Sequence, residues 1–196
     1  MTRHSQNFKM KLKNTLNEMG AKNLDFTCKQ LNKLRFERWK FMKFKNPMLI
    51  VTDMEKSKIF YKDVLGLRVI MNFGANVTLT GGVVLQTKES WEKFIRKSDN
   101  EIIFNGNDAE LYFEEDNFDN FIGKLNALKY IEYVHPVYEH RWGQRVVRFY
   151  DLDKHIIEVG ENMKIVCKRF LDSGLTVEET AKKMDVPIKF VQVCAK

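Results

Sequence analysis

The stretch MLIVTDMEKSKIFYKDVLGL, residues 48–67, decides how the rest of the chain is interpreted. Its first four residues are β-prone and predict a short strand. Asp53 can cap a helix through its side-chain oxygen, and Gly66 can end that helix in the left-handed conformation. Apolar residues recur between them at helical spacing: Met54, Phe60, Tyr61, Val64 and Leu65. The stretch therefore predicts a strand followed by an amphipathic helix.

The same order of elements then occurs twice. Strands are predicted at 67–73, 76–80 and 83–87, and the residues around Trp91 predict a helical turn. In the second half a strand begins at 110, Asp116 and Asn117 can cap a helix, and strands follow at 131–135, 145–150 and 155–159. The helix between them has apolar residues at helical spacing from Phe118 to Leu128. A repeated unit predicts an α+β domain of two βαβββ modules over residues 42–161.

Two stretches at matching places in the repeat resemble one protein family. KSKIFYKDVLGL (56–67) is similar to the first helix of the vicinal oxygen chelate superfamily, where a Ser, a Phe-Tyr pair and a terminal Leu-Gly recur. RFYDLDKHIIEVGE (148–161) resembles the family's closing hairpin, although its turn lacks the family's Pro and Gly. The superfamily includes glyoxalase I, bleomycin-resistance proteins and ring-cleaving dioxygenases. The resemblance implies that the two modules form a curved mixed sheet.

The resemblance also implies where a site lies. Family members hold a divalent metal on the concave face of the sheet, at one position on the first and last strand of each module. The matching positions in this chain are Asn46, Gln86, Glu110 and Glu158. The two amides depart from the His or Glu that metal-using members carry, and without an imidazole the set favours Mn²⁺ or Mg²⁺ over Zn²⁺ or Ni²⁺. The alternative is that the two glutamates bind an organic ligand, an arginine or water.

Arg148 bears on that alternative. Strand alternation places it on one face with Val146 and Tyr150, and the resemblance implies that this face lines the pocket. We expect Arg148 to pair with one carboxylate and to hold the other for substrate. A buried structural salt bridge is an equally open interpretation.

Residues 135–144, HPVYEHRWGQ, are predicted to form a loop that carries several chemically useful side chains. His135 and His140 can transfer protons near neutral pH. Trp142 can stack on a flat ligand, and together with Tyr112 and Phe73 it would fit an aromatic groove. Simple exposure of both histidines to solvent is the other interpretation.

The net charge of +7 is concentrated in residues 1–41, which contain ten Lys or Arg and three Asp or Glu. The rest of the chain is neutral, so the domain itself is not a basic protein. Residues 1–41 have no sustained apolar period and are expected to form no core of their own. A second interpretation is that translation starts at Met42, because the codons for residues 37–39 can form a purine-rich ribosome-binding site.

Residues 162–196 are predicted to form a helical extension that resembles a helix-turn-helix. Thr176 and Glu179 form a capping box, and Pro187 opens the last helix. Binding of DNA is one interpretation. A helical cap on the domain is favoured, because residues 163–196 carry seven Lys or Arg against four Asp or Glu, and the last helix offers only Lys189 and Gln192. We therefore expect nucleic acid not to be a partner.

The three cysteines (Cys28, Cys167 and Cys194) are widely spaced and indicate reduced thiols in a cytoplasm. No apolar run is long enough to cross a bilayer, and no apolar stretch follows the basic N-terminus as in a secretory signal, so no membrane association is expected.

Three functions are compatible with these features. The first is a cytoplasmic glyoxalase-like lyase or isomerase acting on a small oxygenated substrate. In it a metal or Arg148 would stabilise an oxyanion, and Glu158 or Glu110 would accept a proton. The second is a protein of the bleomycin-resistance kind that sequesters a small molecule. The third is a ligand-sensing regulator, which rests on the C-terminal helices. The resemblance also implies a homodimer in which both subunits complete each pocket.

Overall fold

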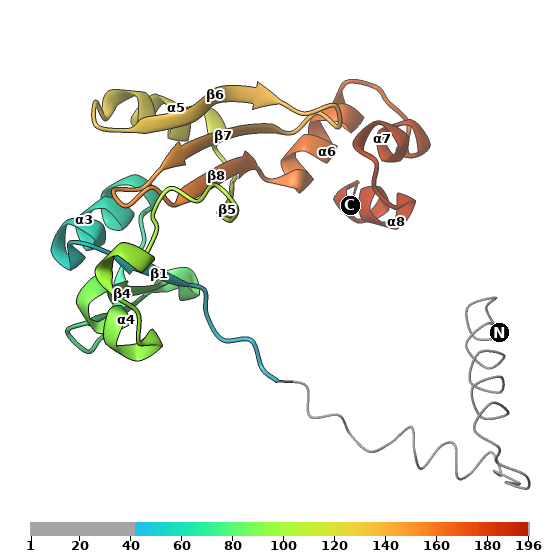
Figure 1. The fold of residues 1–196 in the computed structure, drawn as a ribbon. Coiled ribbons are helices and arrows are strands. Elements are labelled where there is room, and N and C mark those ends of the chain that lie inside the picture. Colours follow the sequence, from blue (N-terminus) through green and yellow to red (C-terminus); the bar gives the residue numbers. More distant parts are fainter. Residues whose placement is uncertain (1–41, 196) are drawn as a thin grey trace, which may run out of the picture. The chain divides into compact units, whose positions relative to one another are not determined.

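The computed structural model describes residues 42–195, so the expectations for residues 1–41 lie outside the described residues. The chain divides into two units, Met1–Phe44 and Lys45–Lys196. Everything below concerns the second unit, which contains all the labelled helices and strands of Figure 1.

The first module has the predicted order of strand, helix and three strands. Its elements are β1 (Met48–Val51), α3 (Met54–Leu65), β2 (Val69–Asn72), β3 (Asn76–Leu79) and β4 (Val84–Thr87). The Asp53 side chain accepts a hydrogen bond from the Lys56 amide, and Gly66 ends α3 at a φ of 69°. The sheet order is β1-β4-β3-β2, and β1 runs parallel to β4. We refer to this sheet as sheet A. A one-turn helix at Thr80–Gly82 separates β3 from β4.

The second module repeats this connectivity. Its elements are β5 (Glu110–Glu115), α5 (Phe118–Ala127), β6 (Glu132–Glu139), β7 (Arg145–Tyr150) and β8 (Ile156–Glu161). The sheet order is β5-β8-β7-β6, with β5 parallel to β8, and we refer to it as sheet B. Helix α4 (Lys88–Ile95) and a short helical turn (Asp99–Glu101) connect the modules. The α+β fold with two βαβββ modules is thus confirmed, as two four-stranded mixed sheets.

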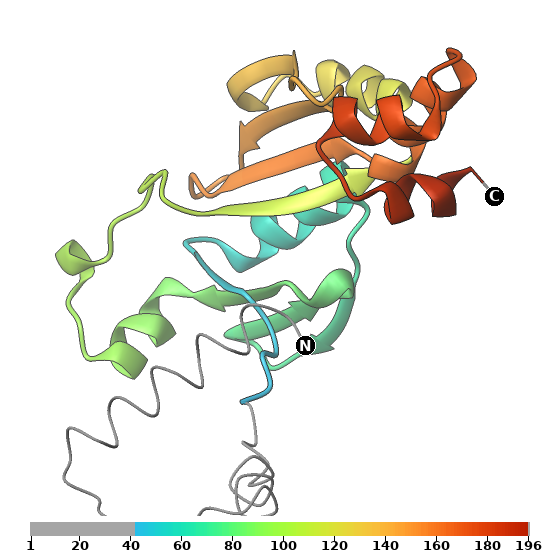
Figure 2. The same cartoon turned by 90° about the vertical axis from the view of Figure 1, so that its right-hand side faces the viewer.

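One hydrophobic core joins the two modules. It takes Val51 and Leu85 from sheet A, Tyr61 from α3, and Phe149 and Ile157 from sheet B, among others. Helix α3 lies between the two sheets in both views (Figures 1 and 2). Each sheet therefore turns one face to the shared core, and the two opposite faces point away from each other. The far face of sheet A is covered in part by α4, which contacts β1 and β4. The far face of sheet B carries the partly exposed Arg148 and Glu110, and we refer to it as the open face of sheet B.

Asp151, in the turn between β7 and β8, links the two modules through hydrogen bonds of its side chain. Its buried carboxylate accepts hydrogen bonds from the Tyr61 hydroxyl at 2.7 Å and from His155 Nδ1 at 2.8 Å. Burial, followed by the charge of Asp151, raises the pKa of Tyr61 well above its ordinary value. His155 therefore has a structural partner in this turn.

The C-terminal helices form a small unit with a core of its own. They are α6 (Met163–Asp172), α7 (Val177–Met184) and α8 (Ile188–Cys194). Val166, Ala181 and Val191 are among the buried residues that join them. The predicted capping box of α7 is present, whereas Pro187 is the N-cap of α8 and not a residue of its first turn. That the protein binds DNA weakly, if at all, stays a prediction.

The structure corrects the predicted loop at 135–144. Strand β6 continues to Glu139, so only the tight turn 140–144 separates it from β7. Among the described residues, none of the helices has the length and apolar character needed to cross a bilayer.

Candidate functional site

Strand alternation gathers polar side chains on the open face of sheet B. Ile157 and Val159 belong to the core, so Glu158 between them faces the other way. The strand register places Arg148 of β7 beside Glu158 of β8 on one side and beside His135 of β6 on the other. The alternation that was read from the sequence therefore places these side chains on one open face.

Arg148 is the centre of this cluster. Its Nε lies 2.8 Å from Glu110 Oε2, its Nη2 pairs with Glu158 Oε2, and its Nη1 lies 3.2 Å from His135 Nε2. We refer to these four residues as the Arg148 cluster. The expectation from the sequence was a pair with one carboxylate, whereas the guanidinium contacts both.

The two carboxylates differ in their access to solvent. The side chain of Glu158 is 7% exposed, whereas that of Glu110 is 38% exposed. A ligand that approaches the open face therefore meets Glu110 first. Two carboxylates share one guanidinium, so the cluster carries one net negative charge when His135 is neutral.

The hydrogen bonds of His135 define its tautomer. Its Nδ1 lies 2.7 Å from the backbone oxygen of Pro136, which can only accept. Nδ1 therefore carries the proton, and Nε2 accepts from Arg148.

A row of aromatic rings extends from His135 along β6 into the following turn. Ring centroids are 6.4 Å apart between His135 and Tyr138, 5.1 Å between Tyr138 and His140, and 4.1 Å between His140 and Trp142. The last pair is stacked, with 10° between the planes. Burial, and then the charges of Arg148 and His135, lower the pKa of His140 below its ordinary value.

Gln144 connects this row to β5 and was missed by the sequence interpretation. Its buried amide donates to the Tyr112 hydroxyl at 2.8 Å and to the Glu161 backbone oxygen at 2.9 Å, and it accepts from Trp142. Gln144 is in phase with Arg148 along the chain. That period was the signal that could have identified it.

The two candidate residues of the first module do not join the Arg148 cluster. Gln86 is on the face of sheet A away from the core, is buried there, and hydrogen-bonds Asn76 of β3 and Ser90 of α4. Asn46 precedes β1 and donates to the Gly82 backbone oxygen at 2.6 Å. Because both sheets pack against one core and these residues lie on the faces turned away from it, one chain does not bring these amides to Glu110 and Glu158.

The residues present do not fit a divalent metal. A guanidinium already lies between the two glutamates, and its positive charge opposes a cation at the same place. Within residues 42–195, no group of three or more His, Cys, Asp or Glu side chains is arranged to hold a metal. A hydrogen-bonding site for an organic ligand fits this donor set better.

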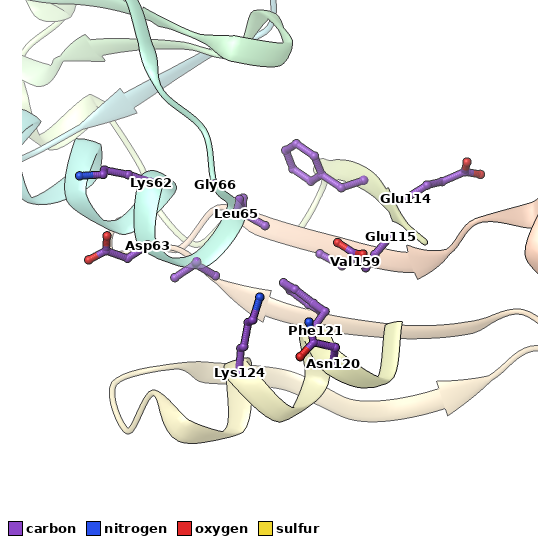
Figure 3. A pocket seen from close by; sticks show the side chains of 12 residues that line it. Lys62, Asp63, Leu65, Gly66, Glu114, Glu115, Asn120, Phe121, Lys124 and Val159 are labelled. Atoms are coloured by element: carbon purple, nitrogen blue, oxygen red, sulfur yellow. The ribbon is translucent and has the colours of Figure 1, made fainter. Parts of the chain in front are cut away.

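A separate hollow of about 330 Å³ lies on the other side of sheet B (Figure 3). It is lined by the end of α3, by β5 and by α5, including Gly66, Phe113 and Phe121. Its charged residues are of both signs, for example Lys62 and Glu115. None of the residues of the Arg148 cluster lines it, so we do not consider it part of the candidate site.

The comparison with known proteins agrees with the fold. Residues 44–164 match the family of glyoxalase-like domains. None of the curated proteins matches the chain. A solved protein of unknown function from Agrobacterium tumefaciens strain C58 is 37% identical with a TM-score of 0.56, over 64% of this chain and 98% of that one.

Two further solved structures share the fold at lower identity. A hypothetical protein from S. aureus is 21% identical with a TM-score of 0.52, over 62% of this chain and 94% of that one. A glyoxalase/bleomycin resistance protein/dioxygenase from Nocardioides is 16% identical with a TM-score of 0.56, over 68% and 91%. Because the family match covers more than half of the chain, and the two modules repeat the expected order, this chain belongs to the glyoxalase-like domain family of the vicinal oxygen chelate superfamily.

Proposed function

We propose that this protein is a glyoxalase-like enzyme of the lyase or isomerase type that acts on a small oxygenated molecule at the open face of sheet B. Arg148, rather than a metal, would bind the oxyanion. The observation that supports this is the convergence of Arg148, Glu110, Glu158 and His135 from four adjacent strands.

The proposed role of Arg148 follows from its three partners. A substrate oxygen replaces the exposed Glu110 at Nε, while Glu158 keeps Nη2 and holds the guanidinium in place. Negative charge that develops on this oxygen, next to a carbon that loses its proton, is then stabilised by a preorganised donor. The displaced Glu110 carboxylate remains beside the substrate and accepts the proton.

Proton exchange tests this chemistry without knowledge of the natural substrate. We would follow the α-protons of hydroxyacetone and dihydroxyacetone in D₂O by ¹H NMR, with protein that has been treated with EDTA. We expect exchange above the buffer rate, and a loss of at least tenfold, about 1.4 kcal/mol, in Arg148→Met. Arg68→Met, which removes an exposed arginine from the first module, is the matched control and should exchange like the parent.

Two results would contradict the proposal. Exchange that EDTA abolishes and Mn²⁺ restores would show that a metal binds the oxyanion. Equal exchange by the parent protein and Arg148→Met would show that the chemistry takes place elsewhere.

The aromatic row favours a second candidate, a protein that sequesters a flat small molecule. Tyr138, His140 and Trp142 form continuous aromatic surface beside the acidic Arg148 cluster. Such a surface suits a ligand with planar rings and positive charge. Tight binding of such a ligand, detected by quenching of Trp142 fluorescence and without any proton exchange, would favour this function over the enzyme.

A further inference from the structure

The turn that carries His140 and Trp142 is short and closed by its own backbone. The His140 amide donates to the Gln144 oxygen at 2.9 Å, and the Gly143 amide donates to the His140 oxygen at 2.8 Å. Gly143 has a φ of 87°, which other residues rarely adopt. We refer to residues 140–144 as the aromatic turn. Its conformation determines where the stacked rings lie relative to the Arg148 cluster.

Helix α6 holds this turn from outside. Arg169 Nη2 donates to the Gly143 backbone oxygen at 2.6 Å and also lies 3.0 Å from Glu161 Oε2. The ring of Phe170 lies against Gly143 so closely that a Cβ atom at that position would overlap it. Figure 1 shows the turn between β6 and β7 at the same end of sheet B as α6.

The anchor of Arg169 is itself fixed. Glu161, at the end of β8, is 4% exposed and accepts from the Arg145 amide at 2.9 Å and from Arg145 Nη2 at 2.7 Å. Arg169 thus joins the turn to a rigid strand end. A further pair, Arg141 with Asp185, is highly exposed and contributes little.

Arg169 and Phe170 lie beyond residue 164, where the match to the glyoxalase-like family ends. The C-terminal helices are thus an addition to the family domain that contacts the candidate site. A helical cap with no other purpose would need only apolar packing. Arg169 also donates to a turn carbonyl, and Phe170 occupies the space that a side chain at position 143 would need. These two contacts indicate a more specific role.

We propose that Arg169 and Phe170 are positioning residues, through which the C-terminal helices hold the aromatic turn so that the His140–Trp142 stack forms one wall of the site. The use of this wall for a ligand rests on the proposed function. The position of the wall does not, and it can be measured without a ligand.

The His140–Trp142 stack can be followed by the fluorescence of Trp142, because an imidazolium in contact with an indole quenches the fluorescence of the indole. Trp142 is observed alone in a background of Trp39→Phe and Trp91→Phe. The titratable and charged groups around His140 are Arg148 on β7 and His135 and Tyr138 on β6. We expect the fluorescence of Trp142 to decrease as the pH is lowered, because His140 becomes protonated. The midpoint should lie below about 6.5, because the pKa of His140 is lowered.

Arg169→Ala should reduce the amplitude of this quenching at least twofold and move its midpoint upward. Arg169→Lys keeps one donor for the Gly143 carbonyl and should restore most of the amplitude. Lys168→Ala, at the exposed neighbouring position of α6, is the matched control and should change neither quantity. Far-UV circular dichroism identifies any variant that has unfolded.

An unchanged amplitude and midpoint in a folded Arg169→Ala would overturn the proposal, and so would an equal loss in Arg169→Lys and Arg169→Ala. Failure of the proposed function is a separate result. The parent protein would then show no proton exchange, while its Trp142 titration would still depend on Arg169.

Discussion

Arg148 uses each of its three nitrogens for a different partner, and the partners are not equivalent. Glu158 is buried, and His135 is oriented by its hydrogen bond to the Pro136 carbonyl, whereas Glu110 is partly exposed to solvent. A ligand that needs a place on the guanidinium can therefore exchange most easily with Glu110. This asymmetry gives the two carboxylates distinct expected behaviour on mutation.

Glu158→Gln tests whether the buried carboxylate serves the site or the fold. The Gln side-chain oxygen can still accept from Arg148, so the fold should survive. The neutral amide binds the guanidinium more weakly than the carboxylate does, so Arg148 is held less firmly for the substrate oxygen. We expect the thermal midpoint to change by only a few degrees and the α-proton exchange to fall at least tenfold, about 1.4 kcal/mol. The measurements are a thermal melt and the NMR exchange assay.

The converse result has an equally clear interpretation. If Glu158→Gln unfolds the domain, Glu158 and Arg148 form a structural salt bridge, for which loss of one partner is costly. The open face of sheet B would then lose its strongest argument as an active site.

His140 makes stability depend on pH in a defined direction. Its pKa is lowered in the folded protein, so between that value and the unfolded value of about 6.5 the unfolded chain binds more protons. The free energy of unfolding should therefore fall as pH falls through about 6.5. His140→Phe keeps the stacked ring but cannot ionise, and should lose this part of the slope.

Urea unfolding at steps between about pH 7.5 and 5 measures the effect. The other histidines and the carboxylates contribute to both proteins, so the difference between the two curves isolates His140. If the two curves of unfolding free energy against pH are parallel, the pKa of His140 is not lowered in the folded protein.

At the scale of elements, local patterns predicted the repeat well and the turn regions less well. The helix at Asp53–Gly66 has its cap, its period and its stop in one short stretch, so its prediction needed no distant contact. Strand β6 was predicted too short because Pro136 interrupts the pattern. As an edge strand with register shifts on both sides of His135, β6 accommodates a residue that lacks an amide hydrogen.

The joint between β8 and α6 gives a prediction with an internal control. Glu161 and Asp119 both pair with Arg145, but Glu161 is 4% exposed and Asp119 is 79% exposed. Glu161→Gln leaves Arg145 and Arg169 without their buried carboxylate and should cost about 2 kcal/mol. Asp119→Asn should cost clearly less than Glu161→Gln, because solvent screens this exposed pair. Equal losses in chemical denaturation would show that burial does not set the strength of these pairs.

At the scale of the whole molecule, the sequence could predict which face of a sheet each residue lies on, but not how the two sheets are oriented relative to each other. The periods of two show that Gln86, Glu110 and Glu158 lie opposite the core-facing positions of their strands. That both sheets pack against one core, with α3 between them, depends on contacts between residues far apart in the chain. The four positions implied by the resemblance are therefore split between two faces, which no local pattern could reveal.

This split leads to a prediction about a second copy of the chain. The outer strand β2 of sheet A exposes Val69, Ile70 and Met71 to solvent. Exposed apolar edge strands are uncommon in proteins that remain monomeric. A partner subunit that covers the edge of sheet A would bury these side chains. We therefore expect a homodimer, observed by size-exclusion chromatography with light scattering as twice the mass of one chain.

Two isoleucines of equal exposure make the test specific. Ile70 on β2 and Ile59 on α3 are both 58% exposed, so a lysine at either position costs the folded monomer little. Ile70→Lys would place a charge in the proposed interface and should shift the protein to the monomer. Its thermal midpoint should then fall at low protein concentration, because dissociation removes the stabilisation that association provides. Ile59→Lys should remain a dimer. A parent protein that is monomeric at all concentrations would contradict the prediction, and a dimer that survives Ile70→Lys would place the interface away from β2.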